Sequence, residues 1–99
     1  MSYEIQYSLV YEKWFNKLKD RTAKTKILVR LARIENGNFG QTKQLDKHLF
    51  ELKLTYGPGY RIYYTLSGNT VVILLIGGDK SSQSKDIIKA KKILTEVEQ

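Results

Sequence analysis

The chain has 99 residues, of which 17 are lysine or arginine and 10 are aspartate or glutamate, so its formal net charge is +7. It has no cysteine and a single histidine, His48, which excludes a disulfide framework, a thiolate site and a multi-histidine metal site. We expect one domain over residues 1–99, with no metal or other cofactor. The positive charge favours a polyanionic partner, either a nucleic acid or an acidic protein.

Neither end of the chain nor its apolar segments indicate a membrane protein. The longest apolar run, residues 71–76, is too short to cross a bilayer. The first residues, MSYEIQYSLVYEKW, include early acidic side chains and no long apolar core, unlike a signal peptide. The sequence therefore indicates a cytoplasmic protein that does not bind membranes.

The first third of the chain changes from strand to helix periodicity. Residues 3–7 alternate as in a short half-buried strand, and Val10, Trp14 and Leu18 then form one helical stripe. Asp20 is placed to cap a second helix. The apolar stripe of that helix is Ala23, Ile27, Leu31 and Ile34, and Gly37 supplies the left-handed residue that ends it.

The rest of the chain reads as three strands and a helix. We expect a loop over residues 36–43, an alternating strand over residues 50–56, and a type II turn in YGPG with Pro58 and Gly59 at its centre. A second alternating strand covers residues 60–66, and SGN forms the next hairpin turn. TVVILLI is apolar on both faces, as in a covered inner strand. The loop GGDKSSQS then leads to a helix with the stripe Ile87, Ala90, Leu94 and Val97.

The order β-α-α-β-β-β-α predicts an α+β fold, with an antiparallel meander sheet packed on helices. Residues Tyr60, Ile62, Tyr64 and Leu66 should face those helices. Arg61, Tyr63 and Thr65 should then lie on the opposite, exposed face, so that removing Arg61 would cost little stability.

That exposed face carries a group of side chains suited to cleaving RNA. In a tight hairpin Lys53 and Arg61 project from neighbouring strands on one side, with Glu51 and Tyr63 beside them and Lys80 after the next strand. Arg61 can donate a pair of hydrogen bonds to a phosphate, and the lysines add charge. Glu51 or Tyr63 can transfer protons if its pKa is shifted. These five residues are the candidate catalytic set.

Each of these assignments has a plainer alternative. Alternating polar residues on a sheet face are ordinary, so Glu51 and Lys53 can be a solvated pair. His48 is either a general base or a surface residue, and Asp79 either braces its loop or contacts substrate. The candidate RNA-binding residues are Lys43, Lys47, His48 and Asp79. The basic helix residues Lys24, Lys26, Arg30 and Arg33 are a solvated face or an RNA-backbone track.

Two segments together, LFELKLTYGPGYRIYY and VVILLIGGDKSSQSKDI, resemble the RelE/ParE superfamily of type II toxin–antitoxin toxins. The chain is most similar to its HigB-like branch, the phage-related addiction-module killer proteins. The resemblance implies a RelE-like fold, ribosome-dependent mRNA cleavage and neutralisation by an antitoxin, usually a helix-turn-helix protein. It places the family's basic positions at Lys53, Arg61 and Lys80. Relatives often have arginine at the first of these, and some have a C-terminal histidine that this chain lacks.

Two functions from different classes stay open. The first is an endoribonuclease that cuts mRNA in the ribosomal A site by attack of the RNA's own 2′-hydroxyl. The second is a ParE-like toxin that inhibits DNA gyrase without catalysis. The strand cations favour the first. In either case we expect an antitoxin that presents acidic and apolar residues to the basic face.

Overall fold

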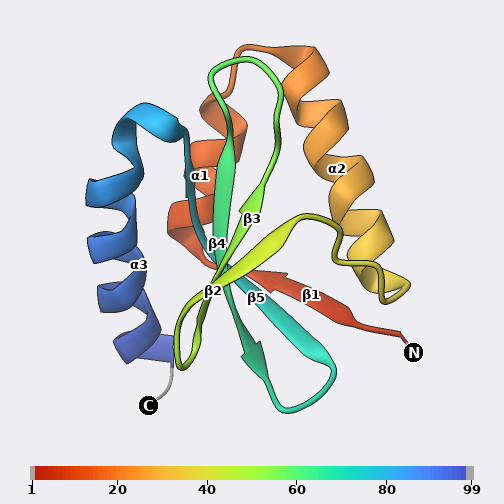
Figure 1. Ribbon diagram of the computed structural model, residues 1–99, viewed down its shortest axis with the longest axis vertical. Helices are drawn as coiled ribbons and strands as arrows, with labels where there is room; N and C mark the ends of the chain where they lie inside the picture. Colours follow the sequence, from red (N-terminus) through yellow and green to blue (C-terminus); the bar gives the residue numbers. More distant parts are fainter. Residues whose placement is uncertain (1, 98–99) are drawn as a thin grey trace.

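The protein is described by a computed structural model that covers residues 2–97 and combines three helices with a five-stranded sheet (Figure 1). Along the chain the elements are β1 (Glu4–Tyr7), α1 (Leu9–Lys17), α2 (Arg21–Glu35), β2 (Thr42–Asp46), β3 (Leu49–Lys53), β4 (Arg61–Ser67), β5 (Val71–Gly78), a 3-10 turn (Lys80–Ser82) and α3 (Gln83–Val97). None of the described helices is long and apolar enough to span a membrane. The α+β class predicted from the sequence is confirmed.

The sheet has the strand order β1-β5-β4-β3-β2. Strands β2 to β5 form the predicted antiparallel meander, whereas β1 pairs in parallel with β5. The sheet is therefore mixed, because the first strand lies at the far edge beside the last one (Figure 1). Strand β5 lies between β1 and β4, as its apolar character on both faces indicates.

The first two helices begin and end at capping residues. Ser8 caps α1 through the Tyr11 backbone N–H, and Asp20 caps α2 through that of Ala23. Gly37, with a φ of 91°, donates to the Ile34 carbonyl just beyond α2. The predicted limits of α2 are thus confirmed. In α1 the buried residue is Tyr11, not the predicted Val10, which is 39% exposed.

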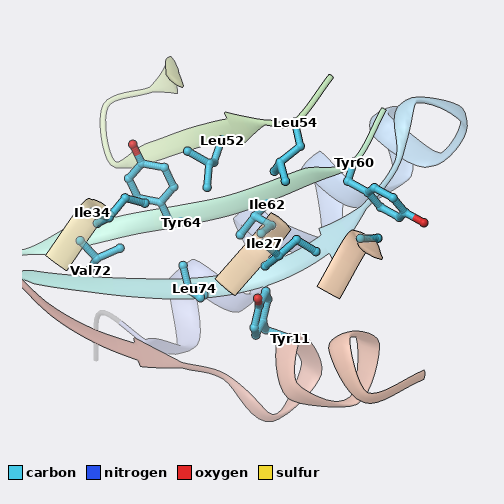
Figure 2. Close-up of a cluster of buried hydrophobic side chains, with 11 residues drawn as sticks. Tyr11, Ile27, Ile34, Leu52, Leu54, Tyr60, Ile62, Tyr64, Val72 and Leu74 are labelled. Atoms are coloured by element: carbon cyan, nitrogen blue, oxygen red, sulfur yellow. The ribbon is translucent and has the colours of Figure 1, made fainter. Parts of the chain in front are cut away.

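One face of the sheet packs against α1 and α2. Figure 2 shows Ile27 and Ile34 of α2 pointing toward the strand residues, with Tyr11 of α1 at the edge of the cluster. The strands and the segment that joins β3 to β4 contribute Leu52, Leu54, Tyr60, Ile62, Tyr64, Val72 and Leu74. Tyr60, Ile62 and Tyr64 therefore face these helices as predicted. Leu66, at the end of β4, is 37% exposed.

The other face of the sheet is covered by α3, which contradicts the prediction that it is exposed. Ala90 of α3 is fully buried in one cluster with Tyr63, and Ile87, Ile93 and Leu94 pack against that cluster. The β4 residues Arg61, Tyr63 and Thr65 are 6%, 0% and 4% exposed. The apolar stripe of α3 needs a sheet face to bury it, and α1 and α2 already occupy the other one. The side chain of Val97 lies outside the described part of the chain.

Two local predictions in the middle of the chain are wrong in detail. Thr42 and Lys43, assigned to a loop, begin the edge strand β2, whose polar residues are all exposed. The hydrogen bond that closes the YGPG turn runs from the Gly59 N–H to the Tyr56 carbonyl, one residue earlier than expected. Gly59 has the expected positive φ, 78°, and Gly57 has one as well.

Candidate active site

Arg61 and Glu51 form a buried ion pair on the α3 side of the sheet. Arg61 Nε donates to Glu51 Oε1 over 2.7 Å, and the two side chains are only 7% and 6% exposed. Gln83, the first residue of α3, has its Nε2 at 3.4 and 3.3 Å from the two carboxylate oxygens of Glu51. Three elements therefore hold this group: β3, β4 and α3.

The hairpin register explains why these side chains meet. Lys53 lies opposite Arg61, and Glu51 lies opposite Tyr63, so Glu51 and Arg61 are diagonal neighbours on one face. Arg61 Nη1 also donates to the Gly59 carbonyl in the turn that joins the strands. The predicted grouping of Lys53, Arg61, Glu51 and Tyr63 on one side of the hairpin is confirmed, although α3 covers much of it.

A small hollow of about 270 Å³ opens beside the ion pair. It is lined by Gln41, Thr42, Lys43, Glu51, Lys53, Arg61 and Gln83. Three of these residues are cations and one is an anion, and the anion is already paired with Arg61. Lys43 and Lys53 therefore give the hollow a net positive charge, which suits a phosphate group.

Lys80 lies next to this group but on the surface. A side chain added at Gly59 would lie 3.6 Å from both Arg61 Nη1 and Lys80 Cβ, which places Lys80 beside the same turn. Lys80 is exposed in the 3-10 turn after β5. It can add positive charge near Arg61, although it does not line the hollow.

Asp79 braces the loop before α3. Its carboxylate accepts from the backbone N–H groups of Ser81 and Ser82, which makes it the cap of the 3-10 turn. The hydrogen bond from the Ser81 side chain is the main reason that the pKa of Asp79 is lowered. Of the two roles considered from the sequence, the structure shows the bracing one.

Tyr63 is too deeply buried to reach a substrate. Its side chain is fully buried, and its hydroxyl has no hydrogen-bond partner in the described part of the chain. Burial, and then the charge of Glu51, raise the pKa of Tyr63 well above its usual range. This burial argues against the predicted role of Tyr63 in proton transfer.

Lys47 and His48 lie away from the hollow. Both are exposed in the turn between β2 and β3, at the opposite end of β3 from Lys53. Lys53 lies five positions after His48 in extended chain, or roughly 16 Å away at the usual rise of a strand. Of the predicted RNA-binding residues, only Lys43 lines the hollow.

Sequence reasoning missed three polar residues of the hollow: Gln41, Thr42 and Gln83. Gln83 had no signal of its own, because it precedes the periodic part of α3. Thr42 could not be recognised from its own segment, because its hydroxyl bonds the Glu51 carbonyl and the Tyr64 hydroxyl, which belong to other strands. All three depend on β2 and α3 lying next to β3, which the sequence pattern did not show.

Arg30 of α2 stabilises the backbone around the hollow. Its guanidinium donates to the carbonyls of Lys53, Phe39 and Gln41, and so fixes the end of β3 against the chain that enters β2. Burial, and then the charge of Arg33, lower the pKa of Arg30. Arg30 is therefore a structural residue and not part of a fully solvated helix face.

Comparison with known proteins identifies the family. The model of the family "Phage derived protein Gp49-like (DUF891)" matches residues 13–96, so the chain belongs to the Gp49-like phage-derived proteins. A protein of Haemophilus influenzae, described as uncharacterized, is 43% identical over 97 residues, which are 98% of each chain.

Solved structures of RelE toxins share the fold. A double mutant of the E. coli toxin RelE in the free state matches with a TM-score of 0.75 and 20% identity, covering 93% of this chain and 97% of that one. RelE-type chains in two toxin–antitoxin complexes also match. The match to the intact E. coli RelBE complex has a TM-score of 0.62 and 20% identity, and covers 79% of this chain and 96% of that one. The match to the RelBE2 complex of Mycobacterium tuberculosis has a TM-score of 0.63 and 17% identity, and covers 81% of this chain and 100% of that one. The fold is thus RelE-like.

Proposed function

We propose that the chain is the toxin of a type II toxin–antitoxin module, of the HigB-like kind, and cleaves mRNA on the ribosome in the cytoplasm. The observation that carries this proposal is the cationic hollow beside the Arg61–Glu51 pair. The RelE-like fold and the membership of a phage-derived family support it. No cofactor is needed for the chemistry below.

Arg61 is the group that holds the scissile phosphate in this proposal. Its Nε and one Nη1 hydrogen are used by Glu51 and by the Gly59 carbonyl. Nη2 donates to no other group within the described residues, and Arg61 lines the hollow. A guanidinium held through Nε and Nη1, with Nη2 still available, can form hydrogen bonds to a phosphate without losing much side-chain entropy.

The reaction is a transfer within the RNA. The 2′-oxygen attacks the neighbouring phosphorus and the bond to the 5′-oxygen breaks, leaving a 2′,3′-cyclic phosphate and a 5′-hydroxyl. One proton leaves the 2′-hydroxyl and one reaches the 5′-oxygen. Because Glu51 is paired and Tyr63 is buried, the remaining titratable side chains of the hollow are Lys43 and Lys53. We assign donation of the proton to the 5′-oxygen to the ammonium group of one of these lysines, acceptance of the 2′-hydroxyl proton to solvent water, and further phosphate charge to Lys80.

The shape of the hollow supports dependence on the ribosome. At about 270 Å³ it is smaller than a typical ligand pocket, and it holds no histidine. Such a site can stabilise the charge of the reacting phosphate but offers little surface to orient an RNA strand. The ribosome would supply that orientation.

The matched structures of RelE with RelB support an antitoxin as the partner. We propose a protein encoded beside this chain, with a helix-turn-helix domain and an acidic region that meets the positive charge around the hollow. Because Tyr63 and most of the strand face lie under α3, this region would contact the hollow and its rim and not an open sheet face.

A reconstituted translation system tests the enzymatic proposal. The purified chain should cut an mRNA that is being translated, and should leave the same mRNA nearly intact when ribosomes are omitted. Efficient cutting without ribosomes would contradict ribosome dependence. Intact mRNA under both conditions, together with inhibition of DNA gyrase by the chain, would favour the non-catalytic ParE-like alternative.

A further inference from the structure

A second hollow, of about 350 Å³, lies between α2 and the chain that leaves β3. It is lined by Thr25, Lys26, Val29, Arg30, Arg33, Leu54, Thr55 and Tyr56. Three of these residues are cations and none is an acid. The nearby Asp20 is occupied, because it caps α2 and accepts a hydrogen bond from the Tyr56 hydroxyl.

The positive charge of this hollow is not neutralised by the protein. Among the described residues there are two ion pairs, Arg61–Glu51 and Lys91–Asp46, and neither involves α2. Arg30 and Arg33 lie one turn apart on that helix, where like charges repel. An uncompensated cluster of this kind in a concave surface attracts an anionic ligand.

Lys26 and Arg33 are the side chains free to meet such a ligand. Arg30 is committed to three backbone carbonyls, whereas Lys26 and Arg33 are exposed. Lys26 Nζ lies 5.1 Å from the centroid of the Tyr56 ring, so the aromatic face holds the ammonium group over the hollow. Thr55 adds an exposed hydroxyl.

This second hollow adjoins the catalytic one. Arg30 lines the second hollow and donates to the carbonyls of Lys53 and Gln41, which both line the hollow beside the Arg61–Glu51 pair. From Lys53 the chain passes directly to Leu54, Thr55 and Tyr56, which line the second. A polyanion that leaves the first hollow past Lys53 would therefore be close to the second.

We propose that the second hollow binds the phosphodiester backbone of RNA through Lys26 and Arg33. This proposal rests on the proposed function only in taking RNA as the polymer. The backbone has two possible sources with the same chemistry, the mRNA strand that is cut or the ribosomal RNA next to it. In both cases the hollow adds affinity and position, and takes no part in the chemical step.

The test compares two double variants that each remove two positive charges. Lys26→Gln/Arg33→Gln alters the second hollow, and Lys89→Gln/Lys92→Gln removes two exposed lysines of α3 as the matched control. The probe is a fluorescent single-stranded RNA with 2′-O-methyl groups, which cannot be cut. Its binding is followed by anisotropy from 50 to 200 mM salt. A second arm measures sedimentation of each protein with purified ribosomes that carry no mRNA.

We expect the α2 variant to bind the RNA probe roughly tenfold more weakly at low salt. The slope of log K against log salt should become smaller in magnitude by about 1.4, because each of the two lost phosphate contacts contributes about 0.7 on a single strand. The control should change by less than half as much. A loss confined to the oligonucleotide arm assigns the hollow to mRNA, and a loss in ribosome sedimentation assigns it to ribosomal RNA.

Equal losses in the two variants, or an unchanged α2 variant in both arms, would overturn the proposal. If the α2 double variant does not melt cooperatively, Thr55→Glu replaces it, since a carboxylate at this exposed position should repel the same phosphate. The probe is not cleaved, so this result is independent of catalysis. A wild-type chain that cuts no mRNA but shows the α2 effect would refute the endonuclease and leave the RNA site standing.

Discussion

Arg61 Nε lies 2.7 Å from Glu51 Oε1 in a pair that is almost fully shielded from solvent. Burial of both charges means that each depends on the other, because an isolated charge in this position would be strongly unfavourable. The pair also leaves Arg61 Nη2 without a partner among the described residues, and Arg61 lines the hollow, so one arrangement provides both stability and a preorganised phosphate ligand.

Arg61→Ala should therefore destabilise the protein as well as inactivate it. Removing one partner of a buried ion pair costs about 3–5 kcal/mol, far more than the small effect expected of an exposed residue. Loss of the phosphate contact should reduce cleavage on the order of a hundredfold. Arg61→Lys should restore only part of that rate. Thermal melting and a cleavage assay in reconstituted translation measure the two effects.

The double variant Arg61→Ala/Glu51→Gln separates stability from activity. Neutralising Glu51 removes the unpaired charge, so this variant should melt at a higher temperature than Arg61→Ala alone. Its cleavage rate should stay as low. A double variant that regains activity along with stability would show that Arg61 serves only the fold.

Glu51→Gln alone tests whether Glu51 transfers protons. If Glu51 only orients Arg61, the rate should fall by roughly tenfold while the shape of the pH–rate profile is kept, because the titrating groups are elsewhere. Loss of one limb of that profile would instead identify Glu51 as the general acid or base.

Tyr63→Phe should leave cleavage unchanged. The Tyr63 hydroxyl is buried with no partner among the described residues, so its removal should keep stability constant or raise it by about 1 kcal/mol. Tyr64→Phe is the matched control, since the Tyr64 hydroxyl lies 2.6 Å from the Thr42 hydroxyl. That change should cost about 1 kcal/mol. Inactive, folded Tyr63→Phe would return this tyrosine to the catalytic set.

Asp79 should contribute to the stability of the fold and not to RNA binding or cleavage. Asp79→Ala should cost about 1 kcal/mol through the lost cap. Because the pKa of Asp79 is lowered in the folded state, its ionised form contributes stability above its unfolded pKa, and this is lost as pH falls through the folded value. The stability difference between wild type and Asp79→Asn, measured by urea unfolding, should thus shrink below a pH of about 4. A difference that grows on acidification would contradict the capping role.

The sequence predicted the elements whose ends carry a capping or turn residue. Asp20 and Gly37 set α2, and the glycines of YGPG fix the β3–β4 hairpin and its register. Strand β2 was missed because an exposed edge strand such as TKQLD has no apolar alternation to reveal it.

The composition of the site was easier to predict than its environment. Register alone brought Lys53, Arg61, Glu51 and Tyr63 together. Whether this polar sheet face is exposed to solvent or covered by a helix depends on where α3 packs. The sequence pattern of an arginine and a glutamate on neighbouring strands is the same for an exposed pair and for a buried one. The clue was β5, whose apolar residues on both faces require cover on both.

The most direct test of the central claim is to map mRNA 5′ ends in cells after brief induction of the wild-type chain and of Arg61→Lys, the more conservative variant. We predict new 5′-hydroxyl ends within translated reading frames for the wild type, far fewer for Arg61→Lys at equal levels of folded protein, and none when translation initiation is blocked. Intact transcripts together with DNA damage, or cuts that persist without translation, would contradict a ribosome-dependent endonuclease.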